Sequence, residues 1–133
     1  YMAHHKKENQ KIGIKTIADD LDIPTPFLGK ILQTLVKHKI LSSTKGPHGG
    51  FGLARDPAEI TLLDIIEIID GMDMFYECLI GLRTCRDYDP SFIPCPLNKK
   101  FRPISKQLYE LFKGETIASL KDDIQQSHGT MGI

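Results

Sequence analysis

Three cysteines are the residues whose type and spacing point most directly to chemistry. Cys78, Cys85 and Cys95 are the only cysteines of the 133-residue chain. Six residues separate the first pair and nine separate the second pair. Glycine, aspartate and proline recur between them, so we expect a loop in which the three thiols can converge.

Thiolates are soft ligands that suit iron-sulfur clusters or zinc. In a protein with no sign of secretion, three close cysteines indicate such a site rather than a disulfide framework, which would leave one cysteine unpaired. Three ligands leave one coordination position open, and an open position suits a sensor. Two alternatives stay open, namely a redox-active thiol pair with a spare cysteine and three inert buried cysteines.

The chain has no net charge, but its charges are unevenly distributed. Residues 1–57 carry 9 basic and 5 acidic side chains, a difference of +4, whereas residues 58–133 carry 8 and 12, a difference of −4. The first half is therefore the candidate for binding a polyanion. No apolar run approaches the ~20 residues that cross a bilayer, and no secretory signal is found. We therefore expect a soluble, cytoplasmic protein with no membrane partner.

Two short amphipathic helices are predicted near the start of the chain. From Ile14 to Leu21 the apolar residues follow the helical i, i+3, i+4, i+7 spacing. Residues 22–24 interrupt this pattern, and Thr25 followed by Pro26 predicts a new helix with Thr25 as its N-cap. This second helix should run from Pro26 to His38, with its leucines on the first helix and a basic outer face. Two helices joined by a tight turn are typical of a helix-turn-helix.

A hairpin is predicted directly after the second helix. Strands are expected at residues 40–43 and 51–54, joined by the glycine-rich tip KGPHGG. Its glycines allow the backbone to approach a phosphate or enter a minor groove, and Lys45 and His48 supply positive or donor groups. A hairpin in this place is the wing of a winged helix-turn-helix. A polar hairpin without a ligand is the alternative.

The second half of the chain is predicted to be helical. Thr61 and Asp64 have the spacing of a capping box at the start of an apolar linking helix, which Gly71 should end. Gly114 should end a longer helix, and Thr116 should cap a final one.

The longer helix has the spacing of a dimerisation seam. Its apolar residues recur at intervals of four and three, as in helices that pack against another helix. They are Leu97, Phe101, Ile104, Leu108 and Leu111. A second copy of the chain is the simplest partner. Pro103 should kink this helix or mark a new start near Arg102.

Taken together, these residues resemble a known family. The stretch IKTIADDLDIPTPFLGKILQTLVKHKILSSTKGPHGGFGLARDP resembles the winged-helix signature of the IscR, NsrR and CymR family of bacterial repressors. The run CLIGLRTC followed by PCPL resembles the cluster-binding loop of that family. The resemblance covers nearly the whole chain in the family's order. The family's first helix, which begins upstream of an YMA-like segment, is expected to be mostly absent here.

The resemblance implies a homodimer that binds a palindromic operator in double-stranded DNA. Residues 26–38 would enter the major groove, and the wing would enter the adjacent minor groove. The positions that match the family's DNA contacts are Thr25, Pro26, Phe27, Lys30, Gln33, Lys45, Pro47, His48 and Gly49.

The resemblance also implies an iron-sulfur cluster, of the 2Fe-2S or 4Fe-4S type, on Cys78, Cys85 and Cys95. The sequence departs from the family in the longer interval between Cys85 and Cys95. It also departs at Asn98, which stands where some members have a histidine ligand. In other members the fourth ligand comes from the N-terminal helix of the partner subunit.

The sequence therefore predicts a mainly α fold, a winged helix-turn-helix with a two-stranded β wing and a long C-terminal dimerisation helix. We expect the DNA-binding region at residues 1–57, a linking helix at 58–77, the cysteine loop at 78–96, dimerisation helices at 97–126 and a flexible tail at 127–133.

The functional hypothesis is a dimeric repressor that senses redox state, nitric oxide or iron-sulfur status. One alternative is a cluster-free repressor that responds to thiol oxidation or to a protein or small-molecule partner. A second is a winged helix used only as a protein adaptor. An enzyme is not expected, because no nucleophile-base pair or phosphate-binding loop is found.

Overall fold

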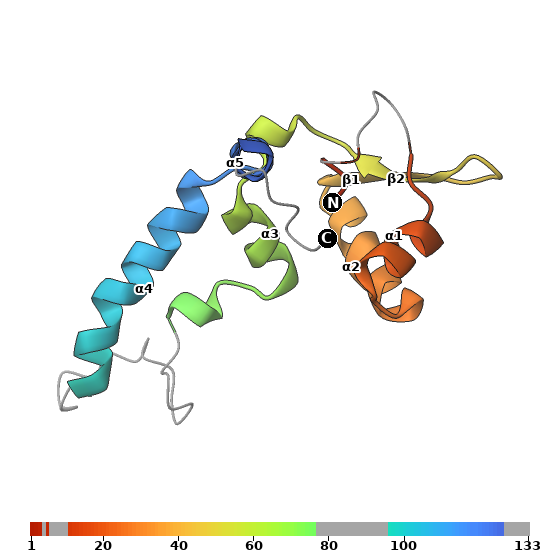
Figure 1. Ribbon diagram of the computed structural model, residues 1–133. Helices are drawn as coiled ribbons and strands as arrows, with labels where there is room; N and C mark the ends of the chain where they lie inside the picture. Colours follow the sequence, from red (N-terminus) through yellow and green to blue (C-terminus); the bar gives the residue numbers. More distant parts are fainter. Residues whose placement is uncertain (4, 6–10, 77–95, 127–133) are drawn as a thin grey trace.

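The computed structural model describes residues 1–3, 5, 11–76 and 96–126, which are mainly helical with one two-stranded sheet. In chain order these residues form α1 (Ile14–Leu21), α2 (Thr25–Lys37), β1 (Leu41–Thr44), β2 (Gly50–Leu53), the 3-10 turn η1 (Pro57–Glu59), α3 (Leu62–Ile69), the 3-10 turn η2 (Asp73–Phe75), α4 (Pro96–Gly114) and α5 (Ile117–Gln126). Figure 1 shows α1, α2 and the hairpin grouped together, with α4 extending as a long arm on the other side of α3. This arrangement confirms the predicted fold class.

The main core lies where α1 and α2 meet the base of the hairpin. Helical spacing places the buried residues of each helix on one face, and Ile60 closes the core from the chain that follows the wing, where it is 0% exposed. The buried cluster contains Ile17, Ala18, Leu28, Leu32, Leu35, Ile40, Leu41 and Ile60. The core therefore fixes the two helices and the hairpin as one unit.

The turn between α1 and α2 differs from the prediction at one residue. Asp22 ends α1 in the left-handed conformation, and the N–H of Ile23 donates to the Ala18 carbonyl oxygen at 3.0 Å. The N-cap of α2 is Pro24, and Thr25 makes no side-chain cap. The predicted Thr25 cap is therefore wrong. The physical reason is that the carbonyl oxygen of Pro24 accepts the first two helical hydrogen bonds, both at 3.0 Å, which places Thr25 inside the helix.

The wing is an antiparallel hairpin. Each of its strands is shifted by one residue toward the tip of the hairpin, relative to the predicted ranges 40–43 and 51–54. Its register pairs Leu41 with Leu53 and Thr44 with Gly50. Ile40, the predicted start of the first strand, instead donates its N–H to the Leu35 carbonyl oxygen at 3.0 Å and so completes the turn that ends α2.

The start and end of α3 follow the predicted signals. Thr61 and Asp64 form a complete capping box. Gly71 has a φ of 78° and donates its N–H to the Ile66 carbonyl oxygen at 3.1 Å. Most apolar side chains of α3 are half-buried rather than enclosed.

The long helix α4 is continuous from Pro96 to Gly114 and contains Pro103. The predicted new start near Arg102 is therefore wrong. Pro103 is exposed, so water can bind the Lys99 carbonyl oxygen that lacks a helical donor. Gly114 ends α4, and the hydroxyl of Thr116 accepts the N–H of Ser119 at 3.1 Å at the start of α5, both as predicted. Within the described ranges, every helix is too short or too polar to span a lipid bilayer.

Candidate nucleic-acid interface

The exposed face of α2 carries most of the side chains predicted to contact DNA from this helix. Phe27 is 60% exposed although its ring is large and apolar. Pro26, Lys30 and Gln33 are exposed beside it, and Thr25 is half-buried. The spacing places Pro26, Phe27, Lys30 and Gln33 on the side of the helix away from the leucines, which hold the opposite side against the core, whereas Thr25 lies beside the leucine face. The helix thus offers an apolar ring, an ammonium group and an amide on one accessible face.

The wing tip carries the second set of predicted contacts. Lys45, Pro47 and His48 are exposed, and Gly49 is half-buried. The N–H of Gly49 donates to the carbonyl oxygen of Gly46 at 2.9 Å, which closes the tip. A Cβ atom at Gly49 would collide with the backbone of β1. Glycine is therefore required for this tight turn, which leaves the lysine and the histidine pointing to solvent at the end of the hairpin.

The stretch of chain that contains these two sets carries charged side chains of a single sign. No aspartate or glutamate occurs between residues 23 and 54, a stretch that contains α2, both strands and the wing tip. The same stretch contains four lysines, all exposed, which are Lys30, Lys37, Lys39 and Lys45. Exposed lysines attract the phosphates of nucleic acid and raise the rate at which they are encountered, and the nearest acidic residues along the chain are Asp22 before α2 and Asp56 after the wing.

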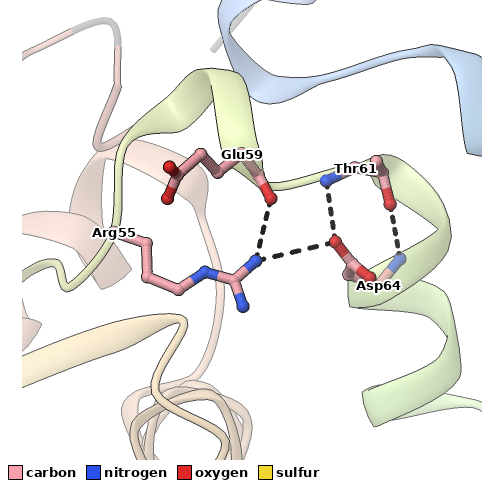
Figure 2. Close-up of polar contacts among 4 residues, drawn as sticks. All are labelled: Arg55, Glu59, Thr61 and Asp64. Atoms are coloured by element: carbon pink, nitrogen blue, oxygen red, sulfur yellow. Dashed lines mark hydrogen bonds and ion pairs between the residues drawn. The ribbon is translucent and has the colours of Figure 1, made fainter.

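A polar junction joins the wing to α3 (Figure 2). Arg55, which follows β2, donates to the carbonyl oxygen of Glu59 at 2.9 Å and lies 3.8 Å from the carboxylate of Asp64. Asp64 accepts the N–H of Thr61 at 3.0 Å, and its own N–H donates to the Thr61 hydroxyl at 3.1 Å. The two side chains of this ion pair are 39% and 40% exposed, so the pair contributes little to stability.

Backbone hydrogen bonds extend this junction to α5. The N–H of Leu62 donates to the Glu115 carbonyl oxygen, and the N–H of Ile117 donates to the Ile60 carbonyl oxygen, both at 2.9 Å. The wing, α3 and the turn between α4 and α5 therefore meet at one joint. Sequence reasoning missed this joint, because no local pattern indicates that residues 60–62 pair with residues 115–117.

One face of α4 is held against the turn η2. Ser105 is buried, and its hydroxyl donates to the carbonyl oxygen of Phe75 at 2.7 Å. The ring of Phe75 meets the rings of Tyr109 and Phe112 edge to face, with centroids 5.6 and 6.3 Å away. The chain just before residue 77 is thereby anchored to the middle of α4.

A second face of α4 is apolar and uncovered. Leu97, Ile104 and Leu111 recur every seven residues and are 42%, 59% and 54% exposed. Phe101 and Leu108, the other residues of the predicted seam, are half-buried. Seven-residue spacing keeps such side chains in one line along the helix, which is the geometry of a contact with another helix.

The predicted cysteine site lies outside the described residues. Cys78, Cys85 and Cys95, most of the predicted loop 78–96 and the predicted tail 127–133 all fall there. Within residues 1–3, 5, 11–76 and 96–126, no three histidine, cysteine, aspartate or glutamate side chains are grouped so that they could hold a metal ion.

Comparison with known proteins decides the family. Residues 1–123 match the Rrf2 family, which is described as iron-dependent transcriptional regulators. The chain belongs to the Rrf2 family. It is 35% identical over 117 residues to an HTH-type transcriptional regulator predicted in Aquifex aeolicus, covering 88% of this chain and 79% of that one. It is 29% identical over 122 residues to protein rrf2 of Nitratidesulfovibrio vulgaris, covering 92% and 78%.

Solved structures of two regulators share the fold of this Rrf2-family chain. IscR of T. potens aligns with a TM-score of 0.68 and 22% identity, over 91% of this chain and 76% of that one. CymR of B. subtilis aligns with a TM-score of 0.70 and 20% identity, over 91% and 84%. As a member of the Rrf2 family, the protein is a DNA-binding transcriptional regulator and not an enzyme.

Proposed function

We propose that this Rrf2-family protein is a dimeric repressor that binds a palindromic operator, with α2 of each copy in the major groove and the wing in the adjacent minor groove. The observation that carries the proposal is the exposed row of Phe27, Lys30 and Gln33 on α2, within a stretch that has no acidic residue. A buried leucine face on the same helix supplies the rigidity that base recognition needs.

The chemistry of each exposed side chain suits a part of the duplex. The ring of Phe27 suits the methyl group of a thymine, the ammonium of Lys30 suits guanine or a phosphate, and the amide of Gln33 suits adenine. Lys45 and His48 would contact the backbone or floor of the minor groove. Four further residues would bring the backbone close to the DNA at the two ends of this surface. They are Thr25 and Pro26 at the start of α2, and Pro47 and Gly49 at the wing tip.

A second copy of the chain is the proposed occupant of the apolar line on α4. Leu97, Ile104 and Leu111 leave three large side chains in water, and burying them against the same line of a partner removes this cost. A two-fold dimer would carry two recognition helices, whose half-sites lie about 34 Å apart on DNA. A palindromic operator follows from that symmetry.

We further propose that Cys78, Cys85 and Cys95 hold an iron-sulfur cluster, of the 2Fe-2S or 4Fe-4S type, and that the state of their segment controls DNA affinity. Three thiolates are a donor set that suits such a cluster, which when bound would supply sensitivity to redox state, nitric oxide or iron supply. The described residues on both sides of the segment support this coupling. Phe75 is fastened to Ser105 of α4, and Pro96 begins the same helix.

The path from that segment to the DNA-binding surface runs through described contacts. A shift of α4 would move Glu115, which is hydrogen-bonded to Leu62 at the start of α3. The capping box of α3 is joined to Arg55 and hence to the end of the wing. A change in the angle of α4 would therefore change the spacing of the two recognition helices.

Binding of duplex DNA tests the DNA-binding part of the proposal. We expect Lys30→Ala to weaken operator affinity and to lower the slope of log affinity against log salt by about 0.9 if Lys30 contacts a phosphate. If Lys30 contacts a base instead, affinity should fall for the operator alone. The control is Lys106→Ala, which removes an exposed lysine from α4. Equal binding by both variants would contradict the assignment of α2.

Iron and sulfide analysis of protein purified without oxygen tests the sensing part. We expect Cys78→Ala, Cys85→Ala and Cys95→Ala each to lose iron, sulfide and visible absorbance and to change operator affinity. Ser91→Ala, in the same segment, is the control. Full absorbance and unchanged binding in all three cysteine variants would contradict the proposal. Wild-type protein without iron but with oxidant-sensitive binding would favour the cluster-free, thiol-based alternative.

A further inference from the structure

The chain that leads into α1 pairs with the outer edge of β2 through a single antiparallel bridge. The N–H of Ile12 donates to the Phe51 carbonyl oxygen at 2.9 Å, and the N–H of Phe51 donates back to the Ile12 carbonyl oxygen at 2.8 Å. Gly50 permits this approach, because a Cβ atom there would collide with the backbone of Ile12. The strand β2 therefore lies between β1 and the segment that enters the helix-turn-helix.

The side chain of Lys11 crosses β2 on the face of the wing that points away from the core. The register pairs Ser42 with Gly52 and Leu41 with Leu53, so Ser42 and Gly52 lie on the face opposite the two leucines. A Cβ atom at Gly52 would lie 3.3 Å from Cδ and 3.5 Å from Nζ of Lys11. The bare backbone of Gly52 is thus covered by the aliphatic stem of the lysine.

The ammonium group of Lys11 ends on β1. Its Nζ donates a hydrogen bond to the Oγ of Ser42, a residue 31 positions away in the sequence. The Ser42 hydroxyl also reaches the carbonyl oxygen of Gly52 at 3.4 Å. A hydrogen bond from a charged donor is stronger than one between neutral groups. The side chain of Lys11 therefore reaches from the segment before α1 across β2 to β1.

We propose that Lys11 is a positioning residue for DNA binding, which fixes the wing relative to α2 without touching DNA itself. This inference rests on the proposed function, in which α2 and the wing tip contact the same duplex. A two-stranded hairpin is only marginally stable by itself. The leucines fasten one face of the hairpin to the core, and Lys11 fastens the other face to the segment before α1.

A fixed wing lowers the ordering cost of binding. If the hairpin moved freely, Lys45 and His48 would lose that freedom on contact with DNA, and the loss would reduce affinity. The effect of Lys11 should therefore depend on the residues at the tip. A direct phosphate contact by Lys11 would act independently of them.

A double-mutant cycle separates these two roles. Lys11→Met keeps an unbranched stem over Gly52 and removes the donor. We expect it to weaken operator affinity about threefold to tenfold in the wild-type protein, which corresponds to a coupling within the usual range for residues that act together. In a background that carries Lys45→Ala and His48→Ala, the same change should weaken affinity less than about twofold.

Ser42→Ala gives the same test without altering any charge and serves if the lysine variant is unstable. Amide hydrogen exchange in the free protein supplies a readout that does not need DNA. We expect the amides of residues 50–53 to exchange faster in Lys11→Met and in Ser42→Ala, with little change in α2. This measurement decides the case even if the tip variant binds too weakly to be titrated.

Three results would overturn the proposal. The first is an unchanged operator affinity in both Lys11→Met and Ser42→Ala, and the second is an unchanged rate of amide exchange in the wing. The third is that Lys11→Met lowers affinity equally in the wild-type and the tip-variant backgrounds and lowers the salt slope by about 0.9, which would make Lys11 a phosphate contact. Lys30→Ala distinguishes these failures from failure of the proposed function. If Lys30→Ala weakens binding while Lys11→Met does not, only the role of Lys11 is wrong.

Discussion

Neighbouring residues of α2 have opposite environments, and this sets their expected roles. Phe27 is 60% exposed, whereas Leu28 is 5% exposed and belongs to the core. A large apolar ring that is mostly exposed contributes little to the core, so Phe27 is available for the DNA recognition proposed above. Both side chains are apolar, so the exposure of each one decides whether its substitution should affect DNA binding or the stability of the fold.

We predict that Phe27→Ala weakens operator binding but changes the free energy of unfolding by less than about 0.5 kcal/mol, as is usual for exposed positions. Leu28→Ala should lower the free energy of unfolding by about 2–5 kcal/mol, because it leaves a cavity in the core. Urea denaturation and duplex titration of the same two variants check both statements. A stability loss in Phe27→Ala as large as that in Leu28→Ala would contradict the assigned environments.

At the scale of elements, caps and turns decide where each helix begins. In the capping box of α3, the Thr61 hydroxyl accepts the N–H of Asp64 and the Asp64 carboxylate accepts the N–H of Thr61. Asp64 also forms an ion pair with Arg55, which follows the wing. The start of α2 has no side-chain cap and relies on the carbonyl oxygen of Pro24. A single side-chain substitution can therefore remove the N-cap of α3, whereas α2 has no side-chain cap to remove.

We predict that Thr61→Ala lowers the free energy of unfolding by about 1 kcal/mol, the usual cost of losing an N-cap. Thr16→Ala is the matched control, because Thr16 is exposed inside α1 and should change stability by less than about 0.5 kcal/mol. Denaturant titration of the two variants checks the difference. Equal stabilities would show that the capping box contributes nothing measurable.

At the scale of the whole molecule, α4 divides its contacts between two partners. One face holds Phe75 through Ser105 and the aromatic rings, and the other face leaves Leu97, Ile104 and Leu111 uncovered. The proposed DNA-binding surface on α2 and the wing therefore lies on one side of α3, and α4 extends as an arm on the other side (Figure 1). This division suits the two-fold repressor proposed above.

We predict that the wild-type protein sediments as the proposed dimer in analytical ultracentrifugation, and that Ile104→Glu sediments as a species of 15.0 kDa. Affinity for a full palindrome should fall by about 100-fold or more, while affinity for a single half-site stays unchanged, because two linked contacts become one. Lys106→Glu, on the exposed side of α4 away from the apolar line, is the control. A variant that stays dimeric would place the dimer interface elsewhere.

The sequence by itself determined the local elements of this protein. Apolar spacing located α1 and most of α2, the Thr61 and Asp64 pair located the start of α3, and the glycines located the wing. The absence of acidic residues between positions 23 and 54 was also readable without a structure. These features depend on hydrogen bonds and side-chain periods within a few residues, which are fixed by local chemistry.

Only the tertiary structure decided which distant residues meet. The Lys11 hydrogen bond to Ser42, the pairing of Ile12 with Phe51 and the junction of Arg55 with Asp64 follow from how the elements pack. The same holds for the uncovered line on α4, whose seam was predicted but whose two faces were not distinguished. Contacts of this kind form because burying a shared core brings separate segments together, and no local pattern encodes that arrangement.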